Sequence, residues 1–224
     1  EARGQTVAAV VATVLKSSES DARKVACHLL GNLGEAAEPH LGAVAERFAD
    51  GDFTVCHAAY DAFVKHGEAR GQTVVAVVAP VLKSRKVDAR KMACQLIGNL
   101  GEAAEPHLGA VAESLADDVW QIRLAACEIL GKHGEAAVPH LGAVAECLSD
   151  GEGDVRAAAC SALGKHGEAA EPHLGSIAKR LQDSETVVRK AAYEALKGHI
   201  EARRQSVAAA VEAIGTNDPD GFAR

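Results

Sequence analysis

Four histidines recur in one short string, which reads GEAAEPHLGAVAE at residues 34–46 and returns almost unchanged three times. A histidine and a carboxylate in fixed order could form a copied metal or acid–base site. A helical metal site needs two ligands four residues apart, and no His-x3-His occurs. Equivalent side chains of stacked helices stand about 8 to 10 Å apart, too far to share one ion. We therefore predict no metal site and no cofactor at His40, His107, His140 and His173.

The cysteines are the second set of residues that could do chemistry. Four of them occupy one position of a repeat, where a tyrosine stands in the remaining copies, and such an exchange is typical of packing. Copies one repeat apart exceed the Cα separation of about 4.4 to 6.8 Å that a disulfide needs. We expect reduced thiols and an intracellular, reducing compartment, although a removed targeting segment stays an alternative. Cys56 and Cys147 lie outside this position and have no base nearby in the sequence, so we predict no catalytic residue and no enzyme.

Internal repetition organises the whole chain. Glycines recur in steps of 33 or 34 residues, and residues 1–67 align without a gap on residues 68–134. Such an alignment indicates duplication of a two-repeat block. The repeat joints lie near residues 34, 67, 101, 134, 167 and 200.

Each repeat contains two segments with helical periodicity. Leu141, Val144 and Leu148 fall on one helix face, and Val155 and Leu163 share a stripe in the next segment. Neither helix can bury its apolar face alone. We predict an all-α fold, a right-handed α-solenoid of about six 33-residue helix pairs plus a final helix near 201–214. The predicted domain spans residues 1–214, followed by an irregular tail at 215–224.

The recurring string also predicts local roles. Gly34 should end one helix in the left-handed conformation, and Pro39 should stand in the first turn of the next, where its missing N–H costs nothing. Gly42 lowers helix propensity, and we predict that it stands there because it lets a neighbouring helix approach closely.

The second segment carries a more specific signature. Asp150 is followed by Val155, Arg156 and an alanine-rich helix, and the same spacing recurs from Asp117 and Asp183. The pattern resembles the HEAT family, especially the short HEAT-like repeats of phycobilisome lyases. The resemblance implies that each arginine pairs with the aspartate of the preceding turn. The chain departs from the pattern where Cys56 replaces the arginine and where Ser17 and Ser84 replace the aspartate.

The resemblance also implies where a partner would bind. HEAT-like solenoids usually bind along the concave face lined by second helices. That face leans towards lysine here, whereas the first helices are rich in glutamate, so an acidic protein segment is the expected ligand. Phe53 and Trp120 precede second helices and are either binding anchors or covers for a neighbouring repeat. The predicted protein-binding residues are Lys24, His28, His57, Asp61, Lys65, Lys91, Gln95, Leu124, Glu128, Lys132, Ser161, Lys165, Lys190, Glu194, Phe53 and Trp120.

Charge and hydropathy limit the class of partner. The formal charge of -7 argues against nucleic-acid binding, and no apolar run is long enough to span a membrane. Residues 6–15 are apolar almost all round, so we expect further repeats or a partner chain to cover this N-terminal end.

The sequence as a whole predicts a non-catalytic protein-binding scaffold or a structural subunit of a larger assembly. The alternative is an enzyme of the bilin-lyase type or a chromophore-handling subunit, for which analogy of fold is the sole argument.

Overall fold

The computed structural model describes residues 2–217, without the side chains of Glu68 and residues 206–217, and these residues form helices and turns but no strand. They form two compact units, residues 1–140 and 141–224, each described by itself. The α-solenoid predicted from the sequence is confirmed, whereas its extent as one domain over residues 1–214 stays a prediction. The longer helices of the first unit are α1 (Ala2–Val14), α2 (Ser20–Asn32), α4 (Phe53–Val78), α5 (Val87–Asn99) and α7 (Trp120–Leu130). Those of the second unit are α10 (Gly153–Gly164) and α12 (Thr186–Asn217).

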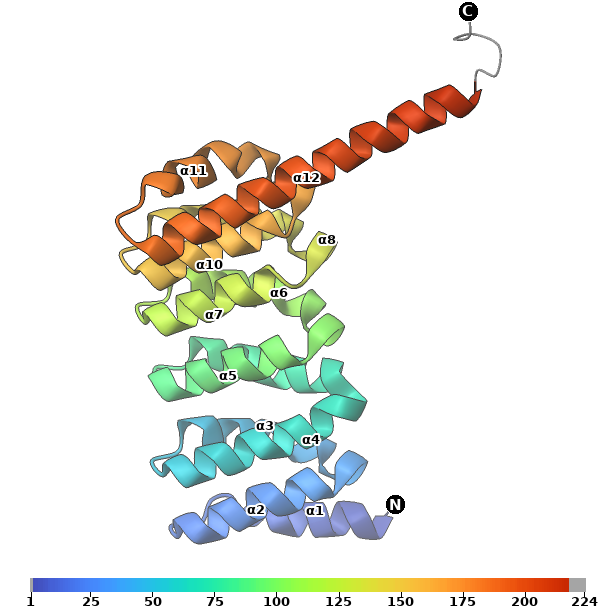
Figure 1. The fold of residues 1–224 in the computed structure, drawn as a ribbon. Helices are drawn as coiled ribbons and strands as arrows, with labels where there is room; N and C mark the ends of the chain where they lie inside the picture. The colour runs from blue at the N-terminus through green and yellow to red at the C-terminus, as the bar shows by residue number, and fades with distance from the viewer. Residues whose placement is uncertain (1, 218–224) are drawn as a thin grey trace, which may run out of the picture. The chain divides into compact units, whose positions relative to one another are not determined.

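In the first unit the second helices lie side by side. Figure 1 shows α2, the first half of α4, α5 and α7 as one layer, with the shorter first helices behind it. Leu30, Ile97 and Leu130 stand one per helix on the inner face of this layer and are fully buried. Burial of such a stripe stabilises each helix pair against its neighbour, as expected for a stack of repeats.

The first helices are less regular than the sequence predicts. In the second repeat a 3-10 turn, η1 (Gly34–His40), precedes α3 (Leu41–Ala45), and a second 3-10 turn, η2 (Glu46–Ala49), follows it. Pro39 therefore lies in the 3-10 turn before the α-helix rather than in its first turn. Two other first helices repeat this division, one as η4 (Gly101–His107), α6 (Leu108–Glu113) and η5 (Ser114–Ala116), the other as η8 (Gly167–His173), α11 (Leu174–Lys179) and η9 (Arg180–Gln182). Another begins with the short helix α8 (Gly134–Ala137), followed by η6 (Val138–His140), α9 (Leu141–Glu146) and η7 (Cys147–Ser149), and in the third repeat η3 (Ala79–Lys83) follows α4 directly.

Glycine acts at two different kinds of position. Gly34 is left-handed with φ of 54°, as predicted, and the same holds at Gly101, Gly134 and Gly167. The prediction for Gly42 is wrong, because nothing lies within 4 Å of a Cβ placed there. Close approach occurs instead at Gly31 on α2, where an added Cβ would stand 2.8 Å from the Cα of Ala62 on α4. The reason is that helix contact in this unit runs through the second helices, while Gly42 faces solvent.

Two predicted joints have no left-handed glycine between their helices. At residue 67 the glycine is helical, and α4 continues through a kink at Arg70, which has φ of -144° and ψ of 43°. Near residue 200, where Ile200 replaces the glycine, α12 continues to Asn217. The boundary at residue 214 between the repeat domain and the tail stays a prediction. Residues 218–224 of the predicted tail lie outside the described residues.

The arginine column forms a ladder of ion pairs, but with a different partner from the one implied by the HEAT resemblance. Arg90 donates from Nη1 to the backbone oxygen of Ser84 in the preceding turn at 2.9 Å, while its Nε donates to Asp117 of the following turn at 2.6 Å. The preceding turn therefore supplies a carbonyl and the following turn supplies the carboxylate. Arg23 with Asp50 and Arg156 with Asp183 repeat this arrangement at 2.7 to 2.9 Å.

All six cysteines are buried and none forms a disulfide. Burial raises the pKa of the Cys27 thiol to about 12. Burial also raises the pKa of Cys56, whose Sγ lies 3.7 Å from the backbone oxygen of Asp50. A thiolate is therefore disfavoured at these positions near neutral pH.

The N-terminal helices leave an apolar face exposed. Val7 is 49% exposed and Leu29 is 46% exposed, whereas the equivalent Val74 and Leu96 of the duplicated block are buried by the block before them. We name the surface formed by Val7, Val10, Val14, Val25 and Leu29 the N-terminal apolar face. Within residues 2–217, none of the helices combines the length and hydropathy that a membrane crossing requires.

Candidate functional site

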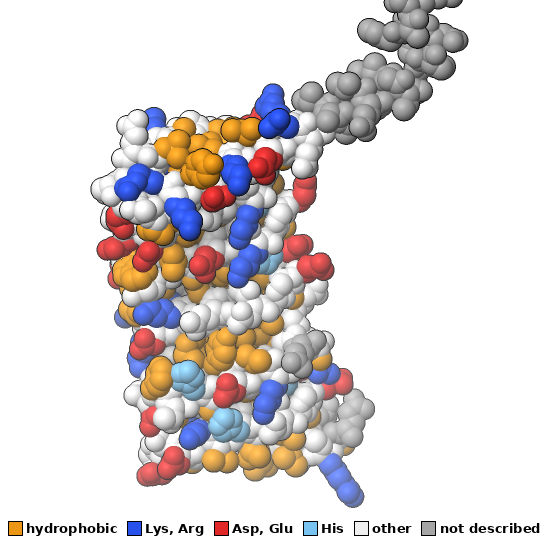
Figure 2. Space-filling model, viewed as in Figure 1, with side chains coloured by type: hydrophobic (Ala, Val, Ile, Leu, Met, Phe, Trp, Pro, Cys, Tyr) orange, Lys and Arg blue, Asp and Glu red, His pale blue; other side chains and the backbone are white. Residues whose placement is uncertain are grey.

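A groove of about 780 Å³ opens on the face of the second helices in the first unit. Its walls come from α4, α5 and α7, and Figure 2 shows the same face, on which apolar, basic, acidic and histidine side chains lie interspersed. The groove is lined by Phe53, His57, Tyr60, Asp61, Asp88, Lys91, Met92, Cys94, Gln95, Gly98, Asn99, Ala125, Glu128, Ile129 and Lys132.

The sequence of α4 explains why a hollow forms beside α5. Gly31 on α2 and Gly98 on α5 occupy one repeat position. An added Cβ at Gly31 would stand 2.8 Å from the Cα of Ala62 on the next second helix, and one at Gly98 would stand 3.1 Å from Cγ1 of the Ile129 side chain. On α4 the same position is Val64, which is 41% exposed. A valine side chain keeps the neighbouring helix farther away than a glycine does, so α4 and α5 cannot close in the same manner.

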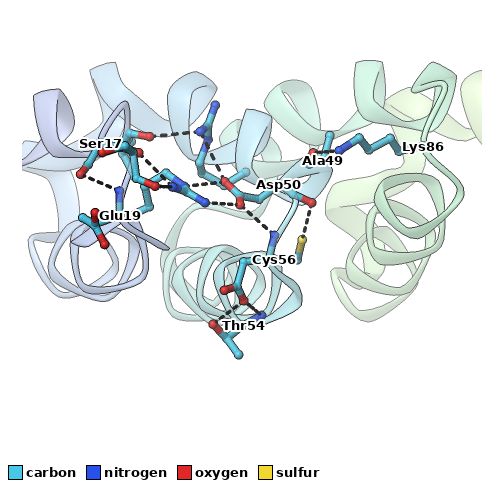
Figure 3. Close-up of polar contacts among 12 residues, drawn as sticks. Ser17, Glu19, Ala49, Asp50, Thr54, Cys56 and Lys86 are labelled. Atoms are coloured by element: carbon cyan, nitrogen blue, oxygen red, sulfur yellow. Dashed lines mark hydrogen bonds and ion pairs between the residues drawn. The ribbon is translucent and has the colours of Figure 1, made fainter. Parts of the chain in front are cut away.

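The joint between α4 and α5 also lacks the ion pair of the ladder. Cys56 stands at the arginine position, and Ser84 stands at the aspartate position of the next turn. Figure 3 shows what replaces the pair: Cys56 Sγ contacts the Asp50 carbonyl, and Lys86 Nζ donates to the backbone oxygen of Ala49 at 2.6 Å. We call this the unclamped joint. It coincides with the boundary between the two duplicated blocks.

The groove has an apolar floor and an aromatic edge. Met92 and Ile129 are 7% and 3% exposed and form part of the floor. Phe53 is 63% exposed and meets His57 edge to face, with ring centroids 4.3 Å apart. Across the groove, Asn99 Nδ2 donates to the Tyr60 hydroxyl at 3.0 Å. Such a surface combines apolar area with polar groups able to orient a ligand.

Charges of both signs line the groove. Asp61, Asp88 and Glu128 contribute three carboxylates, and Lys91 and Lys132 contribute two ammonium groups. Among the residues that the structure describes, none of these five side chains has an ion pair or a side-chain hydrogen bond. The lining is therefore of mixed charge rather than lysine-rich, and its charges are available to a ligand.

The groups in the groove do not assemble a reactive site. Cys94 belongs to the lining, but burial raises the pKa of its thiol to about 12, which leaves little thiolate at neutral pH. No group of three or more histidine, cysteine, aspartate or glutamate side chains in the described part of the chain is placed to hold a metal ion. The groove presents apolar area, amide groups and charges of both signs.

The structure brings together seven of the predicted binding residues. Phe53, His57, Asp61, Lys91, Gln95, Glu128 and Lys132 line the groove. Lys24, His28, Lys65, Leu124 and Trp120 belong to the same unit but lie outside the groove lining. Ser161, Lys165, Lys190 and Glu194 belong to the second unit.

Sequence reasoning missed the residues that flank the predicted stripe. Met92 follows Lys91, Ile129 follows Glu128, and Tyr60 lies three residues after His57. A stripe at spacings of four residues describes one helix, whereas a groove between helices is also lined by the residues beside the stripe. The valine at position 64, in a column otherwise rich in glycine, was the available signal for the hollow.

The fold defines a class, an α-solenoid of helical repeats, and the groove is an open surface on its first unit. Residues 141–224 match the family model described as HEAT repeats, which confirms the resemblance inferred from the repeat signature. Among curated proteins, none matches the chain significantly.

Solved structures extend the likeness over most of the chain. An engineered protein of the Northeast Structural Genomics Consortium has a TM-score of 0.60 and 16% identity, and the match covers 87% of this chain and 96% of that one. A computationally designed armadillo repeat protein for modular peptide recognition has a TM-score of 0.57 and 15% identity, covering 84% and 98%. The complex of CpcE and CpcF of phycocyanin lyase from Nostoc sp. PCC7120 has a TM-score of 0.57 and 22% identity, covering 72% and 98%. Identities at this level show a shared fold.

Proposed function

We propose that this chain is a non-catalytic protein-binding scaffold and that the groove between α4, α5 and α7 holds a segment of its partner. The observation that carries the proposal is the open groove itself, with a buried apolar floor and unpaired polar groups along its walls. Repeat solenoids present such extended surfaces, and the designed armadillo relative is named for peptide recognition.

A protein segment suits the groove better than a compact small molecule. Small-molecule sites usually enclose most of the ligand surface. Here Phe53, His57, Asp61, Gln95 and Glu128 are all exposed and line the groove along three helices. An elongated ligand could contact all three helices while one side of it stays in water.

A non-catalytic role is supported by the groups in the groove. Acyl or group transfer needs a nucleophile activated by a neighbouring base. The Cys94 thiol, with its pKa raised to about 12, lacks that activation. The bilin-lyase alternative rests on the likeness to phycocyanin lyase, and at 22% identity that likeness concerns the fold alone.

The N-terminal apolar face is the second proposed contact. The equivalent face of the duplicated block packs against a neighbouring block, so a repeat of the same kind or a partner chain would bury Val25 and Leu29. Burial of a leucine side chain contributes about 2 kcal/mol, enough for this face to favour a covered state.

Selection from a random twelve-residue peptide library on the immobilised chain tests the role of the groove. We expect binders whose affinity falls at least tenfold when Gln95→Trp fills the groove. The control is Ser176→Trp, which places the same side chain at an exposed position on α11 of the second unit and should leave binding unchanged. Binders that tolerate Gln95→Trp, or the absence of binders, would refute the proposal.

A further inference from the structure

The charged residues of the groove fall into rows that run across the helices. Asp61, Gln95 and Glu128 occupy one repeat position on α4, α5 and α7, and we call them the central row. Four residues later in the sequence stand Lys65 on α4, Asn99 at the end of α5 and Lys132 in the turn after α7, and we call these three residues the outer row. Four residues correspond to about 6 Å along a helix, so a negative row and a positive row lie side by side.

Not all of these charges are equally available. Lys65 Nζ already donates to Asn32 Oδ1 at 2.7 Å, and Lys65 lies outside the groove lining. Asp61, Glu128 and Lys132 line the groove without an ion pair among the described residues. Two carboxylates at the two ends of the central row, and one ammonium group beside the second of them, are therefore left to a ligand.

The distance between the helices indicates how far apart the complementary charges of a ligand should be. Neighbouring second helices stand about 10 Å apart, so the distance from the α4 to the α7 end of the central row is about 20 Å. An extended chain rises about 3.3 Å per residue, and about six residues span that distance. Residues six apart on an extended chain point to the same side, whereas the adjacent residue points to the other side, towards the outer row.

We propose that the groove recognises an extended segment of a partner protein with two basic residues six positions apart. One basic residue would pair with Asp61 and the other with Glu128, and an acidic residue next to the latter would pair with Lys132. The side-chain amide of Gln95, midway along the central row, would bond the backbone of the segment. An apolar side chain would cover Met92 and Ile129. This inference rests on the proposed function and specifies its partner.

The sequences of the selected peptides test the inference separately from the groove. Among binders that are lost with Gln95→Trp, we expect enrichment of lysine or arginine pairs at a spacing of six. The double variant Asp61→Lys with Glu128→Lys should weaken their binding at least tenfold. In the same variant added salt should no longer weaken the binding that remains and should strengthen it, because salt then screens a repulsion between like charges.

The control for the Asp61 and Glu128 variant is a second double variant that makes the same change of charge in the second unit. Asp154→Lys with Glu168→Lys alters two exposed carboxylates of the second unit that are not among the predicted binding residues, and it should change affinity less than twofold. Groove-dependent binders without the basic pair, or binders unaffected by the Asp61 and Glu128 reversal, would overturn the inference and leave the proposed function intact. Absence of any groove-dependent binder would overturn both.

Discussion

Arg90 and Asp117 are 27 residues apart in the sequence and form a bidentate ion pair, with Nε and Nη2 of Arg90 donating to the two carboxylate oxygens at 2.6 and 2.9 Å. The same guanidinium donates to the backbone oxygen of Ser84. Asp117 also accepts the backbone N–H of Val119 at 2.9 Å. One arginine therefore joins the turns that precede two successive second helices, and it does so largely out of water, since both side chains are about a tenth exposed.

Loss of this carboxylate should destabilise the first unit. Asp117→Ala leaves the guanidinium without its main partner, and we expect a loss of about 2 to 3 kcal/mol in the free energy of unfolding. The measurement is urea denaturation followed by circular dichroism. Asp118→Ala is the matched control, because Asp118 also contacts Arg90 but its side chain is 83% exposed. If both variants unfold at the same urea concentration, the buried pair does not have the role assigned to it.

Low pH should reduce the thermal stability of the chain through the arginine–aspartate ion pairs. The hydrogen bond from Arg23 lowers the pKa of Asp50, and that from Arg156 lowers the pKa of Asp183. A carboxyl group whose folded pKa is depressed contributes stability above its unfolded pKa, and that contribution is lost as pH falls through the folded value. We therefore expect the melting temperature to fall steeply below about pH 4.

A variant at one pair can identify the source of this acid sensitivity. Asp183→Asn should lower the melting temperature at pH 7, and the difference from the unmodified chain should shrink as the pH approaches 2. A constant difference over this range would mean that the carboxylate charge at position 183 contributes no pH dependence.

Much of the fold could be predicted because the same pattern of apolar residues recurs in each repeat. The apolar stripe of α10, represented by Val155 and Leu163, is buried as its periodicity indicates. The partner of Arg90 could not be deduced in the same way, because the arginine reaches the preceding and the following turn alike. Which turn supplies a carbonyl and which a carboxylate depends on how successive repeats are stacked.

The candidate groove was predicted less completely. Its polar residues on the stripe, such as Lys91 and Gln95, followed from helical spacing. The position of the groove along the chain did not follow from helical spacing, because a groove forms where two neighbouring helices do not pack closely. Two substitutions in regular columns mark it, namely Val64 in place of glycine and Cys56 in place of arginine.

Two glycines should respond to alanine in opposite directions. Gly31→Ala places a Cβ 2.8 Å from the Ala62 Cα, so α2 and α4 must move apart, and we expect destabilisation of about 1 to 3 kcal/mol. Gly42→Ala meets nothing within 4 Å and should gain up to about 1 kcal/mol of helix propensity. Thermal melts of the two variants provide the comparison. A stabilised Gly31→Ala would contradict the close contact of these helices.

The unclamped joint offers a direct test of what holds the groove open. Cys56→Arg together with Ser84→Asp restores at α4 and α5 the pair that Arg23 and Asp50 form at α2 and α4. The backbone is suited to it, because Ser84 has φ of -62° and ψ of 142°, close to the -62° and 155° of Asp50. A charge-assisted pair should add about 1 to 2 kcal/mol to the free energy of unfolding. It should also draw α5 towards α4 and weaken groove-dependent peptides.

The two single variants distinguish the effect of the ion pair from the effect of each substitution alone. Cys56→Arg alone brings a guanidinium to the joint without a carboxylate, and Ser84→Asp alone brings a carboxylate without a cation, so neither should stabilise the chain as the double variant does. Urea unfolding gives the coupling free energy, and hydrogen exchange of residues 79–99 reports the tightening of the joint. A double variant that is no more stable than the sum of the single variants would mean that the missing pair is not what leaves this joint open. In that event the bulk of Val64 remains as the cause, and Val64→Gly should close the groove where the restored pair did not.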